Sequence, residues 1–272
     1  MADFNKEKID RIYQSSKLLL KKNIESFNPR NYNIVFMSGS YVTDSGPENV
    51  IFERAYEASI KFNPVFILHG GDLVYKGNEE NILYLKSKVE LLYKNKKQIP
   101  IFVIPGDYDF DPINKTMEPF IKHISGLHFT IKINRLHFTL IALNNAITEN
   151  AVNYQEYGLS EGELKYLKDN LPSPLDQDTV LIAMHIPPKD GKFAIMDTTC
   201  FSQGKEDFYY LIKNRVSAIL VSHISACCKS IINNTKYILS SGTGAPLNKN
   251  EINHITLINI KDRIPTYYKI PI

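Results

Sequence analysis

Residues 70–75, GGDLVY, decide the fold, because they follow the apolar run 65–68 and carry a carboxylate just beyond it. Three later stretches repeat this arrangement: PGDYDF at 105–110, AMHIPP at 183–188 and VSHISA at 221–226. An open α/β sheet places its functional groups just beyond the carboxyl ends of its strands. The recurrence predicts one shared site at a sheet edge, formed by Asp72, Asp107, His185 and His223.

The flanking sequence predicts alternating strands and helices in the first half of the chain. Apolar residues at helical spacing indicate helices at 5–27, 48–62 and 81–93, and short apolar runs indicate strands at 33–37, 65–68 and 101–104. This order favours parallel strands joined by right-handed crossovers. After Pro119 the pattern changes, since residues 128–133 and 137–143 alternate around Asn134 and Arg135 as a β-hairpin does.

The second half continues as an α/β chain. Ser160 and Glu163 form a capping-box pattern at the start of a helix over 159–171. Extended runs follow at 180–184 and 218–222, and near Tyr237, Ile255 and Tyr267. Because no repeat, low-complexity tract or linker interrupts the chain, we expect an N-terminal helix within residues 1–30 and a single domain over 31–272.

Composition limits the classes of function. A chain of 272 residues that is 43% hydrophobic can bury a large core, and its formal net charge of +3 is too weak to indicate nucleic acid or an anionic membrane as partner. The apolar run 18–20 is too short for a signal peptide or a membrane span. Cys200, Cys227 and Cys228 do not form a disulfide framework, and reduced thiols fit a cytoplasmic protein.

The four polar residues suit a metal site. Two imidazoles and two carboxylates match a borderline or moderately hard divalent ion such as Zn, Mn or Fe(II). Taken singly they have simpler interpretations, since an Asp after Gly-Gly is commonly a turn former. Because a carboxylate or imidazole recurs at the same place after four different strands, a metal site is favoured over these simpler interpretations. His69, at the end of an apolar strand beside the site, is expected to be a core residue or to orient a ligand.

The motifs resemble those of the calcineurin-like metallophosphoesterases. GGD resembles the family's GD motif, PGDYD its GNHD or GNHE motif, HIPP its single-His motif and SHIS its GHxH motif. SEGELKYLKDNLP at 160–172 and YILSSGTGAP at 237–246 are similar to flanking family segments, so the resemblance covers residues 32–270. It implies a mixed β-sandwich flanked by helices, in αββα layers.

The chain also departs from the family pattern. Gly39 and Tyr41 stand where the family has its DxH pair, Tyr108 replaces the His of GNHD, and Ser225 replaces the second His of GHxH. Of the ligands of one family ion, only the bridging Asp72 remains. The resemblance implies that the other ion has a complete set here: Asp72, Asp107 (in place of Asn), His185 and His223.

These departures predict weak chemistry. One divalent ion (Mn, Fe or Zn) can bind, and a second is not expected. Two ions with two carboxylates leave a family site at about +2, whereas one ion leaves this site near zero, so its attraction for phosphate falls. Tyr108 could donate a proton to the leaving group, but a phenol with a pKa of about 10 suits neutral pH poorly.

Two functions therefore remain open. The chain is at most a slow single-metal hydrolase of phosphomonoesters or phosphodiesters that takes a phosphoester small molecule, or it is a catalytically inactive pseudoenzyme that binds or scaffolds a protein partner. Tyr75 matches the GDxxY spacing of purple acid phosphatases, and Asp44 lies in the loop after the first strand, so either could rebuild the lost metal site. Packing for Tyr75 and a turn for Asp44 are the favoured interpretations.

Overall fold

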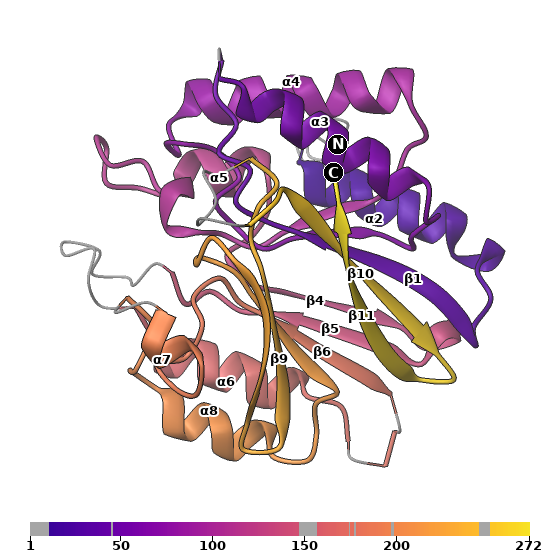
Figure 1. Ribbon diagram of the computed structural model, residues 1–272, viewed down its shortest axis with the longest axis vertical. Helices are drawn as coiled ribbons and strands as arrows, with labels where there is room; N and C mark the ends of the chain where they lie inside the picture. The colour runs from indigo at the N-terminus through magenta and orange to yellow at the C-terminus, as the bar shows by residue number, and fades with distance from the viewer. Residues whose placement is uncertain are drawn as a thin grey trace, which may run out of the picture.

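Two β-sheets stack face to face, and helices cover the outer face of each, as the computed structural model shows (Figure 1). The structure describes residues 11–44, 46–146, 157–173, 175–176, 178–196, 199–244 and 251–272. The predicted mixed sandwich with αββα layers is confirmed.

The first sheet has the strand order β11-β10-β1-β2-β3 within the described residues. It contains β1 (Asn31–Met37), β2 (Ile67–His69), β3 (Ile101–Val103), β10 (His254–Lys261) and β11 (Ile264–Pro271). The predicted parallel arrangement of its first three strands is confirmed, whereas β10 runs antiparallel to β1. Two helices provide the crossovers, α3 (Glu48–Ile60) and α4 (Glu79–Asn95).

The second sheet has the order β4-β5-β6-β7-β9-β8 within the described residues. Its strands are β4 (Phe129–Ile133), β5 (Phe138–Ala142), β6 (Thr179–Ala183), β7 (Ala218–Val221), β8 (Cys227–Ile232) and β9 (Thr235–Ser240). The predicted hairpin is confirmed as β4 and β5, with a 3-10 turn between them (Asn134–Leu136). Strands β5, β6, β7 and β9 are mutually parallel, so β6 and β7 end at the same edge.

The helices of the second half were predicted in part. Helix α6 (Glu161–Asn170) begins as expected, because the side chain of Ser160 accepts a hydrogen bond from the Glu163 amide. Strand β8 and the short helices α5 (Glu118–His123), α7 (Phe193–Met196) and α8 (Lys205–Ile212) were not predicted. None of the helices in the described ranges combines the length and the apolar character that crossing a bilayer requires.

Apolar side chains fill all three gaps between the layers. Phe36, Phe66, Phe102 and Phe138 are fully buried between the two sheets. Further apolar clusters separate the first sheet from α3 and α4, and the second sheet from α6 and α8. Since both faces of each sheet are covered, the central strands appear in the sequence as unbroken apolar runs.

The N-terminal segment packs on the edge of the first sheet. Helix α2 (Ile12–Asn23) continues as a 3-10 turn (Ile24–Ser26), and the expected beginning of this helix near residue 5 lies outside the described residues. The Ser16 hydroxyl donates to the Ile101 carbonyl at 2.7 Å and accepts from the Ile101 amide at 2.8 Å. Ser16 thus provides hydrogen-bond partners for backbone groups of the edge strand β3 that do not pair with β2. The division at residue 30 stays a prediction.

Candidate metal centre

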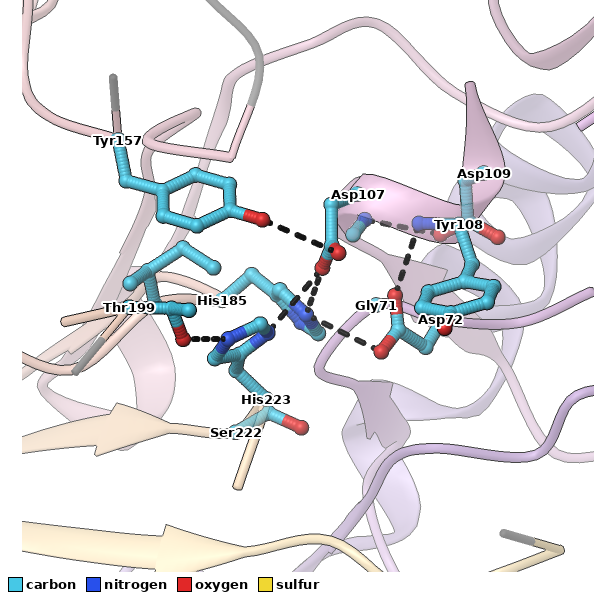
Figure 2. A network of polar contacts seen from close by, with 12 residues as sticks. Gly71, Asp72, Asp107, Tyr108, Asp109, Tyr157, His185, Thr199, Ser222 and His223 are labelled. Carbon is cyan, nitrogen blue, oxygen red and sulfur yellow. Dashed lines mark hydrogen bonds and ion pairs between the residues drawn. The ribbon is translucent and has the colours of Figure 1, made fainter. Parts of the chain in front are cut away.

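Four strand ends meet between the two sheets. Strands β2 and β3 deliver two carboxylates, and β6 and β7 deliver two imidazoles, to one cluster (Figure 2). One ligand atom from each side chain lies within 4.8 Å of all the others, in the metal-compatible group found among the described residues: Asp72, Asp107, His185 and His223. The structure therefore brings together the four residues that the sequence singled out, and their binding of an ion stays a prediction.

His185 is fully buried and held by the backbone. Its Nδ1 lies 2.6 Å from the carbonyl oxygen of Gly70, and because a carbonyl only accepts, Nδ1 carries the proton. Its Nε2 lies 3.0 Å from Asp107 Oδ1 and 3.3 Å from Asp72 Oδ2. Such a backbone bond to the far ring nitrogen is typical of metal-binding histidines. A ring nitrogen between two carboxylates needs a proton or a cation.

The pKa of His185 reflects this position. Burial lowers the pKa, but the charges and hydrogen bonds of Asp72 and Asp107 outweigh burial and raise it well above its ordinary value. Without an ion, a proton on Nε2 therefore satisfies the two carboxylates.

Asp107 joins the two histidines. Its Oδ1 lies 3.0 Å from His185 Nε2 and 3.2 Å from His223 Nδ1, and its Oδ2 accepts a hydrogen bond from the Tyr157 hydroxyl at 3.3 Å. Burial raises the pKa of Asp107, but the two imidazoles lower it further, so that it lies far below its ordinary value. Thr199 Oγ1 lies 2.5 Å from Nε2 of His223 and orients that ring.

Asp72 is buried and held from two sides. The Tyr41 hydroxyl donates to its Oδ2 at 2.7 Å, and the Tyr108 amide donates to its Oδ1 at 3.1 Å. Burial, followed by the negative charge of Asp72, raises the pKa of Tyr41, so its hydroxyl stays protonated. Tyr41, which stands where the family has the histidine of its DxH pair, thus contacts Asp72, the carboxylate that would bridge two ions.

The loops that carry the site adopt constrained backbone conformations. Tyr41, Asp72 and His223 have φ values of 47°, 55° and 66°, a left-handed region that non-glycine residues rarely enter. Such strain concentrates at functional positions. Gly71 has a φ of 93°, and a Cβ there would lie 2.6 Å from His185 Nδ1, so this position requires glycine.

Asp109, which the sequence analysis did not single out, ties two of these loops together. It is fully buried and accepts hydrogen bonds from the amides of Leu73 at 2.8 Å, Val74 at 3.2 Å and Gly106 at 2.8 Å. Burial, together with the charge of Asp72, raises the pKa of Asp109 to about 7. The second Asp of PGDYDF was the sequence signal that could have indicated it.

The predicted catalytic tyrosine lies at the rim of the site. Tyr108 is 42% exposed, and its ring packs edge-on against Tyr41 with centroids 5.0 Å apart. Burial and the nearby carboxylates raise its pKa. Tyr75 is 51% exposed, and its ring centroid lies 5.9 Å from that of Tyr108. Asp44 is exposed and is not part of the cluster of carboxylates and imidazoles.

Three other residues lie at or near the site, and the sequence indicated only His69 among them. Tyr157 and Thr199 contact the site from segments without regular periodicity, so no sequence signal indicated them. His69 is fully buried at the end of β2, and its Nε2 lies 2.8 Å from Ser40 Oγ. Burial lowers its pKa to about 3, in agreement with the expected core position.

The comparisons with known proteins agree with this architecture. The fold is similar to a purple acid phosphatase from yellow lupin, with a TM-score of 0.65 and 12% identity over 89% of this chain and 52% of the other. This chain thus spans about half of that phosphatase. It is also similar to the anchor protein of the Plasmodium inner membrane complex, with a TM-score of 0.61 and 11% identity over 89% and 84%.

Comparison of the sequence with family models identifies the family. No curated protein sequence matches this chain significantly. The family model described as calcineurin-like phosphoesterase matches residues 42–227, which is more than half of the chain. The protein therefore belongs to the calcineurin-like phosphoesterase family.

Proposed function

We propose that this protein holds one divalent ion, Mn, Fe or Zn, and hydrolyses a phosphomonoester or phosphodiester slowly at that ion. The observation that carries the proposal is the convergence of two carboxylates and two imidazoles within 4.8 Å, from Asp72, Asp107, His185 and His223. Nitrogen and carboxylate donors in equal number suit these three metals.

The residues present fit such an ion. His185 presents Nε2 to both carboxylates while the Gly70 carbonyl holds its other nitrogen. Asp72 and Asp107 balance the charge of one divalent cation. When bound, the ion supplies Lewis-acid polarisation of a phosphoryl oxygen.

A second ion has little support. The Tyr41 hydroxyl donates a hydrogen bond to Asp72 Oδ2, and the raised pKa of Tyr41 keeps the proton on the phenol. Gly39 has no side chain to offer at the position of the family carboxylate. Without a two-ion clamp on the attacking and departing oxygens, slow turnover is expected.

Tyr108 is the proposed proton donor to the leaving group. It lies at the rim of the cluster and is 42% exposed, within reach of solvent and of a small substrate. Because its pKa is raised, it releases its proton reluctantly, which again predicts a low rate.

The second candidate function is an inactive family member that binds or scaffolds a protein partner. The hydrogen bond from Tyr41 to Asp72 favours it, because this bond occupies the carboxylate on which two-metal chemistry depends. The Plasmodium protein of similar fold is an anchor, so the fold is compatible with such a role.

We also propose a cytoplasmic location. The three cysteines, one buried and two partly buried, are thiols and not disulfides. Reduced thiols are usual in the cytosol.

Turnover measurements separate the two functions. Purified protein loaded with Mn, Zn or Fe(II) is assayed with p-nitrophenyl phosphate and bis(p-nitrophenyl) phosphate. Slow hydrolysis is expected, and His185→Ala or Asp72→Asn should abolish both ion binding and turnover, whereas His128→Ala, outside the cluster, should preserve them. Hydrolysis that survives His185→Ala contradicts the proposal. No hydrolysis with any metal supports the binding protein.

A further inference from the structure

A cavity of about 350 Å³ lies beside the cluster of carboxylates and imidazoles, and aromatic side chains form most of its wall. Its lining includes Tyr75, Tyr108, Phe110 and Tyr157. Cavities that bind small molecules begin at about this size and combine apolar walls with a few placed polar groups. A cavity of this volume has room for one flat ring system.

Asp107 connects the cavity to the cluster. It lines the cavity and also contacts His185 and His223 through Oδ1. Figure 2 shows Tyr157 and Tyr108 on opposite sides of Asp107. A molecule in the cavity therefore reaches the donor atoms of the proposed ion site directly.

Two tyrosines of the cavity wall expose much of their surface. Tyr75 and Tyr108 are 51% and 42% exposed, and their ring centroids lie 5.9 Å apart. Tyr41 packs edge-on behind Tyr108 and restrains its ring. Exposed aromatic surface that is gathered in one place indicates a binding site, because aromatic rings gain by stacking on other rings.

The charge around the cavity indicates the rest of the ligand. Lys76 also lines it, with Nζ 5.9 Å from the centroid of the Tyr75 ring. Asp107 lines the same cavity and belongs to the cluster that would hold the proposed ion. A ligand with an anionic group at the cluster and an aromatic group against the tyrosines complements both features.

We propose that this cavity binds the flat aromatic group of a phosphoester whose phosphate lies at the cluster. The inference rests on the proposed function for the place of the phosphate, and it names the substrate class: phosphate esters whose alcohol portion carries an aryl ring or a nucleobase. The tyrosine wall provides the preference for these esters over alkyl phosphates.

Binding of non-hydrolysable probes tests this without reference to turnover. Calorimetry on ion-loaded protein compares phenylphosphonate with methylphosphonate, and phenylphosphonate should bind about tenfold more tightly, a difference of about 1.4 kcal/mol. Tyr75→Ala should remove most of this preference and leave methylphosphonate binding unchanged. Tyr75→Phe should keep it, as should Tyr268→Ala, which removes a tyrosine of similar exposure from β11.

A nucleoside 5′-phosphonate separates the two sources of the aromatic group. Binding tighter than that of phenylphosphonate assigns the cavity to a base, and weaker binding assigns it to an aryl ring. Equal affinity for phenyl- and methylphosphonate, no binding of either, or an unchanged preference in Tyr75→Ala would overturn the inference.

The proposed function can fail independently. A phenyl preference without hydrolysis of any ester would sustain the cavity assignment and reject the hydrolase. Hydrolysis without a phenyl preference would support the hydrolase and reject the cavity assignment.

Discussion

Replacing Tyr41 with phenylalanine tests whether a single hydroxyl group holds the central carboxylate of the site. Tyr41→Phe removes the donor that lies 2.7 Å from Asp72 Oδ2. The ring remains and keeps its edge-on contact with Tyr108, whose centroid is 5.0 Å away. The Tyr108 amide still donates to the other oxygen of Asp72. The substitution therefore isolates one hydrogen bond.

The expected loss follows from the character of that bond. A hydrogen bond to a charged group contributes about 1.5–3 kcal/mol to stability. Removing a partner that orients a metal-binding carboxylate typically weakens metal affinity by about 10- to 100-fold, which corresponds to about 1.4–2.7 kcal/mol. The first figure concerns folding stability, and the second concerns the ion. The second predicts that Tyr41→Phe binds its ion at least about tenfold more weakly, still at one ion per chain.

A chelator competition measures this affinity. Metal-free protein and its variants are titrated with Mn or Zn against an indicator chelator of known affinity. Tyr108→Phe is the matched control, because it keeps the backbone donor to Asp72 and should bind the ion as the parent protein does. An unchanged affinity in Tyr41→Phe would refute the claim that this hydroxyl supports the ion site.

Three further predictions concern other parts of the same account. Gly71→Ala should abolish ion binding, because its Cβ would lie 2.6 Å from His185 Nδ1 at a φ of 93°; Gly126→Ala, whose nearest contact is 3.4 Å, should bind the ion normally, and intact binding in Gly71→Ala would contradict the geometry. Ion affinity should rise with pH by up to about tenfold per unit near neutrality, because the raised pKa of His185 makes the ion displace a proton; a flat profile between pH 6 and 8 would refute this. Ser16→Ala should lower the free energy of unfolding by about 1–3 kcal/mol in urea titrations, because it removes the hydroxyl that pairs with both the amide and the carbonyl of Ile101, and a loss below about 0.5 kcal/mol would contradict the edge-capping role.

The strands and long helices were predictable because each has a local period. Helices α3 and α4 bury one apolar stripe against the first sheet, and that stripe recurs in the sequence at helical spacing. Strand β8 escaped prediction because its first half is only partly buried and mixes polar with apolar residues. Helix α7, with four residues, is too short to show a period at all.

The candidate ligands were predictable for a different reason. Asp72, Asp107, His185 and His223 each follow a strand, and strands that are parallel within their sheet end at one edge. Tyr157 reaches Asp107 only through the path of a loop, and no local pattern encodes that path. The same is true of the Tyr41 hydroxyl, because the sequence shows which residue is lost but not that the phenol turns toward Asp72.

The central claim is that the cluster holds one ion, and counting ions tests it most directly. The protein is stripped with chelator, refilled separately with Mn, Zn and Fe(II), desalted, and its metal content per chain is determined by elemental analysis. We predict about one ion per chain, lost in His185→Ala. No retained ion would contradict the metal site itself, and two ions per chain would contradict the conclusion that Tyr41 and Gly39 leave no second site.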